Sequence, residues 1–316
     1  MIQRVRSQTE SLLGQGAIAE TDPMLLEEMV ALVVAQGLDV VSLSEAHRRL
    51  TAREFTRRFV CFTFDGAYQA TLASVSRLFQ GRGLPFTLFV AADFVDSGAM
   101  PWWIVLESLI IRSERITAEL DANGQQHLPC RDEVSKRACY TRLYRSLAER
   151  ASAERAQQME VLCRRQGVDI KALAAQEMLS GAELKALAAD PLVTLGSQAG
   201  GLRPLAELTY DEAKDDLSQS LDRLETVLGN RPRHLAYPGA QSGSAGIREF
   251  RLAAALGIET AVTAVEGALW PEHAGDPFAL PRIALDNDPA TLVRALMLSG
   301  GTPFAAGAPT ANKASA

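Results

Sequence analysis

The stretch FVCFTFDGAYQATL, residues 59–72, decides the fold class of this chain. Its first six residues are a near-continuous apolar run, which is typical of a strand in a parallel sheet covered on both faces. The run ends at one acid, Asp65, with a glycine directly after it. A helix is expected from about Gln69 to Arg82, closed by Gly83, and PFTLFVA then predicts a second buried strand. Strand, helix and strand at this spacing indicate a βαβ unit.

The segment before this unit carries helix and strand signals of its own. PMLLEEMVALVVAQG has helical apolar spacing, with Asp22 as the candidate N-cap, Pro23 in the first turn and Gly37 as the stop. A strand is expected in LDVVSL, and Ser44 is expected to cap a short helix in EAHRRL.

The pattern changes from about residue 101 to 190. WWIVLESLIIR is helical in spacing, ITAELDANGQQHLPC predicts a hairpin around Asn123 and Gly124, and mostly helical segments follow. We interpret this stretch as an insertion. The alternation then resumes with the strand VTLGS, a long helix opened by a capping box of Thr209 and Glu212, the strand RHLAYP, the helix EFRLAAALG, the strand TAVTA and a last helix in PATLVRALMLSG.

Composition and charge narrow the function classes. A content of 47% hydrophobic and 22% charged residues is ordinary for soluble domains. The net charge of −6 argues against nucleic acid and anionic membranes as partners. Because no apolar run has the length of a signal peptide core or of a membrane span, we expect a cytoplasmic protein. Four scattered cysteines without a CxxC pair are expected to be reduced structural thiols.

The residues that end each predicted strand are the candidate ligand-binding groups. Parallel strands with helical crossovers place such groups at their carboxyl ends. These groups are Asp65, Ala92 and Asp93, Gln198, Tyr237 and Pro238, and Arg282 in LPRIAL.

Six segments occur in a specific order: TFDGAY, GLPFTLFVA, PLVTLGS, EAKDDLSQSLDRLETVLG, HLAYPG and LPRIAL. In these segments the chain resembles the polysaccharide deacetylases with a NodB-homology domain, carbohydrate esterase family 4, from Met1 to about Gly300. The resemblance implies an α/β fold, a distorted (β/α) barrel spanning residues 1–300 with a mainly helical insertion at about 101–190. Residues 301–316 are expected to be a disordered tail.

The resemblance also implies carbohydrate N-deacetylation with a divalent metal, usually zinc, held by one Asp and two His. An ungapped comparison places the catalytic base at Asp65, but it places the three metal ligands at Gly66, Gln198 and Leu202. A further histidine of the family corresponds to Gln3. Gly and Leu side chains donate no electron pair, and an amide oxygen is a poor zinc ligand beside imidazole. We therefore expect no metal or other cofactor.

The four histidines of the chain lie away from these motif positions. We expect them to be surface or packing residues; they are His47, His127, His234 and His273.

Asp65 and Arg282 are the catalytic candidates, each with a structural alternative. Asp65 either binds ligand or caps the helix that follows it. Arg282 either orients Asp65 in an ion pair, as an Arg near this motif does in family members, or makes a salt bridge elsewhere.

Four further residues are candidates for substrate binding. Gln198 carries an amide that suits sugar hydroxyls and acetamido groups, because it donates and accepts hydrogen bonds. In the family, the segment matching Tyr237 and Pro238 lines the substrate groove and contributes a backbone amide to the oxyanion. Helical spacing buries one of Trp102 and Trp103 and leaves the other for stacking on a sugar, a role assigned here to Trp103.

Three hypotheses about function remain open. The first is a metal-free barrel that binds an N-acetylated saccharide, a nucleotide-linked sugar or a protein partner in polysaccharide metabolism. The second is an active carbohydrate N-deacetylase that uses Asp65 with a non-standard or absent metal site. The third is a scaffold whose contacts lie on the inserted helices. Because fold alone does not certify function, the substrate class of the family transfers more safely than its reaction.

Overall fold

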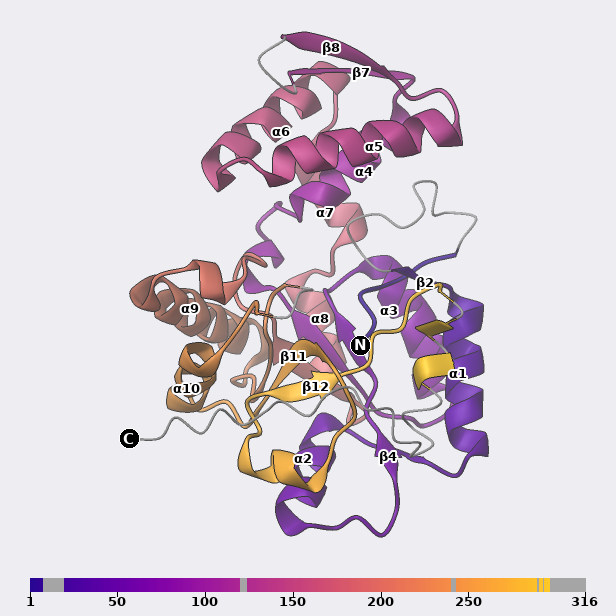
Figure 1. The fold of residues 1–316 in the computed structure, drawn as a ribbon, viewed down its shortest axis with the longest axis vertical. Helices are drawn as coiled ribbons and strands as arrows, with labels where there is room; N and C mark the ends of the chain where they lie inside the picture. The colour runs from indigo at the N-terminus through magenta and orange to yellow at the C-terminus, as the bar shows by residue number, and fades with distance from the viewer. Residues whose placement is uncertain (8–19, 120–123, 240–242, 289, 292, 296–316) are drawn as a thin grey trace.

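The computed structural model of this chain describes residues 1–7, 20–119, 124–239, 243–288, 290–291 and 293–295. Its centre is a parallel sheet of six strands in the order β12-β11-β10-β9-β6-β5 (Figure 1). The strands are β5 (Thr63–Asp65), β6 (Phe86–Val90), β9 (Val193–Ser197), β10 (His234–Ala236), β11 (Thr260–Glu266) and β12 (Leu280–Arg282).

The two edge strands of this sheet approach each other. In a flat sheet of six strands they would lie about 24 Å apart, five spacings of ~4.8 Å. Arg282 on β12 nevertheless hydrogen-bonds to Asp65 on β5. The N-terminal residues fill the seam, since the Ile2 amide donates to the Thr63 carbonyl and the Leu285 amide donates to the Met1 carbonyl, both at 2.9 Å. The sheet is therefore curled into a half-barrel, which confirms the expected distorted (β/α) barrel.

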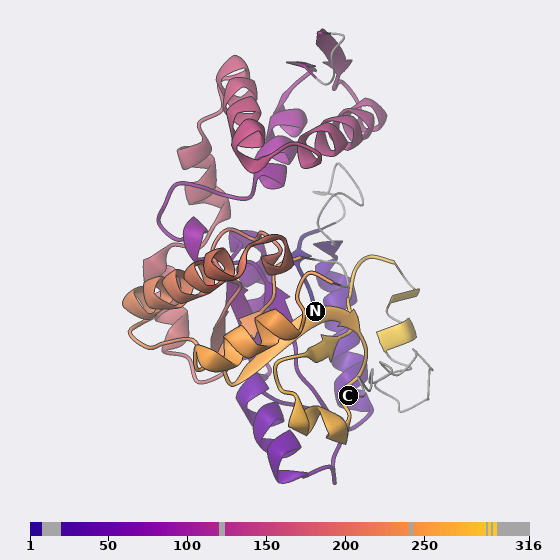
Figure 2. The ribbon, with the colours of Figure 1, turned by 60° about the vertical axis from the view of Figure 1, so that its left-hand side comes forward.

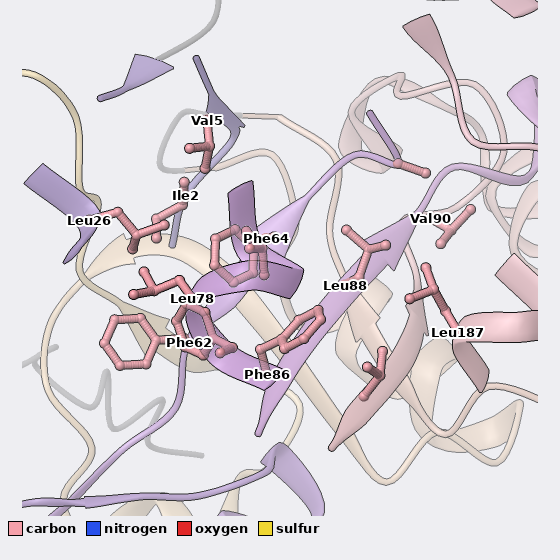
Figure 3. Packing of buried hydrophobic residues seen from close by; sticks show 14 of the residues in the cluster. Ile2, Val5, Leu26, Phe62, Phe64, Leu78, Phe86, Leu88, Val90 and Leu187 are labelled. Atoms are coloured by element: carbon pink, nitrogen blue, oxygen red, sulfur yellow. The ribbon is translucent and has the colours of Figure 1, made fainter. Parts of the chain in front are cut away.

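Helices pack around the sheet and bury its apolar side chains. They are α1 (Pro23–Ala35), α2 (Leu43–Ala52), α3 (Gln69–Val75) with the π-helical turn Ser76–Gln80, α8 (Gly181–Ala188), α9 (Tyr210–Leu228) and α10 (Ile247–Ala255). Figure 3 shows one cluster of buried residues, whose members include Phe64 and Phe86 of the sheet, Ile2, Leu26 of α1 and Leu187 of α8. Phe64 and Phe86 pack edge to face with centroids 5.8 Å apart. This packing fixes the strands whose ends carry the candidate site.

The inserted segment has a hydrophobic core of its own. It comprises α4 (Trp102–Arg112), β7 (Arg115–Glu119), β8 (Gln125–Pro129), α5 (Glu133–Ala148), α6 (Ser152–Gln166) and α7 (Ile170–Glu177). It stands at one end of the molecule in both views (Figures 1 and 2). The buried residues of this core lie between Met100 and Met178, and the barrel contributes one further residue, Tyr68. Helix α8 packs with the core of the barrel instead. The predicted hairpin is confirmed by the antiparallel β7–β8 pair, while residues 120–123 lie outside the described residues.

Two local predictions are wrong. FVCFTF is not one strand, because β4 (Phe59–Val60) pairs with β3 (Asp39–Val40) whereas β5 pairs with β6. An apolar run gives no sign of this change of partner. Ser44 does not cap α2, because Ser42 is the N-cap and accepts a hydrogen bond from the Glu45 amide at 3.1 Å.

Other local predictions are confirmed. Asp22 caps α1 with Pro23 at its first position, and Thr209 and Glu212 form the capping box of α9. The expected disordered tail, residues 301–316, and most of the last predicted helix lie outside the described residues. Among the residues that the structure describes, none of the helices is both long and apolar enough to cross a membrane.

A separate two-stranded parallel sheet lies next to the insertion. Its strands are β1 (Arg4–Val5) and β2 (Glu20–Thr21). Val5 also donates its amide to the Thr71 hydroxyl of α3 at 3.0 Å. This pair brings Arg4 beside the inserted helices.

Candidate functional site

Asp65 and Arg282 form a buried, bidentate ion pair at the carboxyl ends of the two edge strands. Nη1 and Nη2 of Arg282 donate to the two carboxylate oxygens of Asp65 at 2.6 and 2.9 Å. Both side chains are only 6% exposed. Nε of Arg282 donates to the Thr263 carbonyl at 2.9 Å, which fixes the plane of the guanidinium. The structure therefore contains the predicted ion pair of Arg282 with Asp65, and a catalytic role of either residue stays a prediction.

The alternative role of Asp65 as a helix cap is wrong. Helix α3 begins at Gln69 with Tyr68 as its N-cap, and no side chain accepts a hydrogen bond there. The turn between Asp65 and the helix is too long for an N-cap at residue 65, because a capping side chain reaches only the second or third amide after it. Both oxygens of Asp65 instead face the guanidinium.

Gly66 adopts a backbone conformation that favours glycine, and an aromatic ring lies against it. Its φ is +95°, and its amide donates to the Phe89 carbonyl at 2.9 Å. A Cβ atom placed on Gly66 would lie 2.4 Å from Cε2 of Tyr68. The space beside Asp65 in which a second side chain would start is thus filled by the Tyr68 ring.

Gln198 follows β9 and Gly66 follows β5, at the same end of the sheet, with β6 between these two strands. The backbone amide of Gln198 donates to the Val90 carbonyl at 2.8 Å. The preceding carbonyl, that of Phe89, accepts the hydrogen bond from the backbone amide of Gly66. The side chain is 8% exposed, and its Oε1 is buried with no hydrogen-bond partner. A buried acceptor without a partner costs about 1–3 kcal/mol, so it is found where a ligand or a water can supply the donor.

Leu202 is half-buried and has a φ of +62°, which is uncommon for a residue with a branched side chain. It follows two glycines, and the amide of the first, Gly200, donates to the Asp216 carboxylate at 2.9 Å. Burial raises the pKa of Asp216, and the neighbouring Asp93 raises it further. The Leu202 side chain is a hydrocarbon and has no electron pair to offer a metal ion.

The metal ion that the resemblance implies does not fit these residues. Of the three ligand positions, one is a glycine covered by Tyr68, one is an amide and one is a leucine. Within the described part of the chain, no three side chains of His, Cys, Asp or Glu converge in a way that could hold a metal ion.

None of the four histidines belongs to a metal-binding group within the described residues, and three of them make side-chain contacts. His234 is 2% exposed, and its two ring nitrogens lie 2.8 Å from the Ser44 hydroxyl and 2.7 Å from the Thr260 hydroxyl. Burial lowers the pKa of His234 to about 4. His127 contacts the Thr117 hydroxyl in the hairpin, and His273 contacts Trp270. Burial also lowers the pKa of His47.

The remaining predicted site residues lie in two different environments. Tyr237 is buried, donates its hydroxyl to the Phe278 carbonyl at 3.1 Å and packs against Phe250. Pro238 is buried beside it. Trp103 is half-buried in α4, and its indole nitrogen is buried without a hydrogen-bond partner. A contact of these three side chains with substrate stays a prediction.

Trp102 packs within the inserted segment. Its ring stacks on Tyr144 with centroids 4.9 Å apart, and the Arg155 guanidinium lies 5.2 Å from its centroid. Both tryptophans are half-buried, so the expected contrast between one buried and one exposed ring does not hold.

The sequence did not predict a cluster of charged residues that lies beside the site. Nη1 of Arg4 donates to Glu107 of α4 at 2.6 Å and lies 3.6 Å from Glu20. Arg6 forms ion pairs with the same two glutamates, and Glu177 of α7 lies 4.0 Å from Arg4. The side chains of Arg4 and Glu107 are 3% and 12% exposed. Sequence reasoning missed this cluster because its members are up to 173 positions apart and none stands in a motif.

Tyr68 was missed for a different reason. Its signal was present in FDGAY, where a bulky aromatic residue follows a glycine by two positions. Only the fold shows that the ring turns back over that glycine.

Comparison with known proteins agrees with the fold described above. A family model described as polysaccharide deacetylase matches residues 52–260. No curated protein matches the sequence. Among solved structures, the Streptococcus pyogenes deacetylase PplD in complex with acetate superposes with a TM-score of 0.60 and 14% identity, covering 94% of this chain and 96% of that chain.

Two further solved structures are similar over almost their whole length. IcaB from Ammonifex degensii has a TM-score of 0.58 and 14% identity, with 94% of this chain and 96% of that chain covered. A de-N-acetylase from Aggregatibacter actinomycetemcomitans has a TM-score of 0.57 and 12% identity, with 93% and 97% covered. At these identities the similarity shows a shared fold.

Proposed function

The chain belongs to the polysaccharide deacetylase family, and from that premise we propose that it binds an N-acetylated saccharide without hydrolysing it. The observation that carries the proposal is the set of side chains at the three metal-ligand positions. Gly66 is covered by Tyr68, Gln198 offers an amide, and Leu202 offers hydrocarbon. The fold and the acid are retained while the donors are absent from these positions.

The chemistry of amide hydrolysis supports the absence of turnover. A metal would supply hydroxide near neutral pH and polarise the carbonyl. Without such a group, Asp65 would have to act as a lone general base, a role that typically contributes ~10²–10⁴-fold. Arg282 orients Asp65 through both carboxylate oxygens, but it supplies no hydroxide.

The unpartnered Oε1 of Gln198 supports ligand binding. A buried amide oxygen accepts a hydrogen bond from the N–H of an acetamido group or from a sugar hydroxyl, and a bound saccharide would satisfy it. Solved structures of similar fold include a protein described as a de-N-acetylase and a deacetylase in complex with acetate. N-acetylated saccharide is therefore the ligand class proposed.

The test uses the unmodified protein. Metal content is measured by elemental mass spectrometry, acetate release from chitooligosaccharides is followed with and without added Zn²⁺ or Co²⁺, and saccharide binding is titrated by calorimetry. We expect no stoichiometric metal, no acetate release and measurable heat of binding. Tightly bound stoichiometric metal together with turnover that Asp65→Ala abolishes would establish an active deacetylase instead.

A protein partner is the other outcome of this test. If saccharides give no heat of binding and acetate is not released, the proposal of a saccharide-binding protein fails, and a partner in polysaccharide metabolism becomes the leading hypothesis. A cytoplasmic location belongs to the same proposal, and cell fractionation tests it.

A further inference from the structure

Gly66 and Tyr68 together close the position where the family carries its second aspartate. We propose that the Tyr68 ring fills the space in which a side chain at residue 66 would start, and that this former ligand position has become a packing contact between the barrel and the inserted segment. The proposal deepens the proposed function, because it takes Gly66 as the former ligand position. Restoring a metal site would therefore require the Tyr68 ring to move, in addition to the replacement of three side chains.

The first observation is steric. A Cβ on Gly66 would lie 2.4 Å from Cε2, 2.8 Å from Cζ and 3.0 Å from the hydroxyl oxygen of Tyr68. Non-bonded heavy atoms have their optimal separation near 3.5–4.0 Å. Any side chain at residue 66 would therefore overlap the ring at its first carbon, before a carboxylate could be reached.

The second observation is that the ring cannot swing away freely. Tyr68 is 4% exposed and belongs to the apolar cluster of the inserted segment, together with Ile104 of α4 and Met178. Tyr68 also forms an antiparallel bridge with Met178, and the Leu179 amide donates to the Ala67 carbonyl at 2.8 Å. Displacing the ring would therefore disturb the junction between the insertion and the barrel.

The steric claim is tested by a double-mutant cycle that combines Gly66→Ala with Tyr68→Ala. The strain of an alanine at φ +95° is present in both backgrounds and cancels in the cycle. We expect Gly66→Ala to lower the urea midpoint strongly in the native chain and by less than half as much in the Tyr68→Ala background. Equal losses in the two backgrounds would overturn the proposal.

A matched control is Gly229→Ala. Gly229 has a φ of +83°, but a Cβ there would have no atom within 4 Å. Its substitution carries a similar backbone strain without a clash, so its loss in urea midpoint should be the same with and without Tyr68→Ala. If Gly229→Ala lowers the urea midpoint by different amounts in the two backgrounds, Tyr68→Ala alters the whole fold. The coupling between residues 66 and 68 would then not report a local contact, and the proposal would fail.

A second measurement reads out the metal itself. The donors are grafted by Gly66→Asp, Gln198→His and Leu202→His, once with Tyr68 present and once with Tyr68→Ala, and Co²⁺ binding is followed by its visible absorption and by calorimetry. We expect one equivalent of Co²⁺ to bind only where Tyr68 is removed. Binding in both folded grafts, or in neither, would show that Tyr68 is not what closes the position. Because this test uses no saccharide, its failure is distinguishable from failure of the proposed function.

Discussion

Nη1 and Nη2 of Arg282 donate to the two carboxylate oxygens of Asp65, and this ion pair joins the first and last strands of the six-stranded sheet. The two residues are 217 positions apart, so their contact depends on the complete fold. The contact that holds the Asp65 carboxylate in place thus also holds the two edge strands of the sheet together.

Breaking this ion pair should be costly. We expect Arg282→Met to lower the free energy of unfolding by about 3–5 kcal/mol, because Asp65 is left buried without its counter-charge. The double change Asp65→Leu with Arg282→Met should cost less than the sum of the two single changes. Urea denaturation measures these values.

The exposed pair of Arg294 and Glu266 is the control for this prediction. Their side chains are 44% and 45% exposed, so Arg294→Met should cost at most about 1 kcal/mol. Additive losses at Asp65 and Arg282 would mean that the buried pair has no special energetic coupling.

Gln198 should separate binding from stability. Gln198→Leu removes the unpartnered Oε1 and keeps a similar volume, so the free energy of unfolding should stay unchanged or rise by up to about 1 kcal/mol. Saccharide affinity should fall by about tenfold or more, since one hydrogen bond of roughly 1.5 kcal/mol is lost.

The matched control is Gln219→Leu on the exposed face of α9, which should leave the affinity unchanged. Calorimetry and urea denaturation are run on both variants. A large loss of stability in Gln198→Leu with unchanged affinity would assign the amide a structural role.

The order of elements could be predicted from sequence because the signals are local. The Asp22 cap, the Thr209 and Glu212 capping box and the buried strand PFTLFVA each depend on a few neighbouring residues. The break inside FVCFTF could not be predicted, because β4 and β5 differ only in their strand partners. Pairing partners are set by the whole fold, and an apolar run does not encode them.

The residues of the candidate site also fall into two groups, those with local sequence signals and those whose contacts depend on the whole fold. Asp65, Gln198 and Arg282 could be located because each ends a strand, and the resemblance suggested the Asp65–Arg282 pair. Tyr68 and the Arg4–Glu107 contact could not be located, because they arise where the insertion meets the barrel. No spacing rule relates residues on two such separate segments.

His234 should make the stability depend on pH. Its pKa is lowered by burial to about 4, below the ordinary value of 6.5, so the unfolded chain binds a proton more readily than the folded chain. The stability from neutral His234 is therefore complete above about pH 6.5 and is lost as the pH falls toward 4, by up to about 3 kcal/mol.

His234→Gln should lower stability at pH 7 but flatten this loss between pH 6.5 and 4. The control His127→Gln, on the exposed hairpin, should keep the slope of the native chain. Urea denaturation at several pH values provides the comparison. An unchanged slope in His234→Gln would assign the pH dependence to other groups.

The contact of Arg4 with Glu107 should hold the inserted segment against the barrel. Arg4→Met leaves Glu107 and Glu20 buried without one of their two guanidinium partners, so we expect a loss of about 3 kcal/mol or more in the free energy of unfolding. Hydrogen exchange should accelerate first in α4 and α7, the helices that carry Glu107 and Glu177. The control is Arg137→Met, which breaks an exposed pair with Glu133 on α5 and should cost about 0.5 kcal/mol or less. If Arg4→Met changes neither stability nor exchange in α4 more than Arg137→Met does, the charged cluster does not fasten the insertion, and apolar packing around Tyr68 carries that contact.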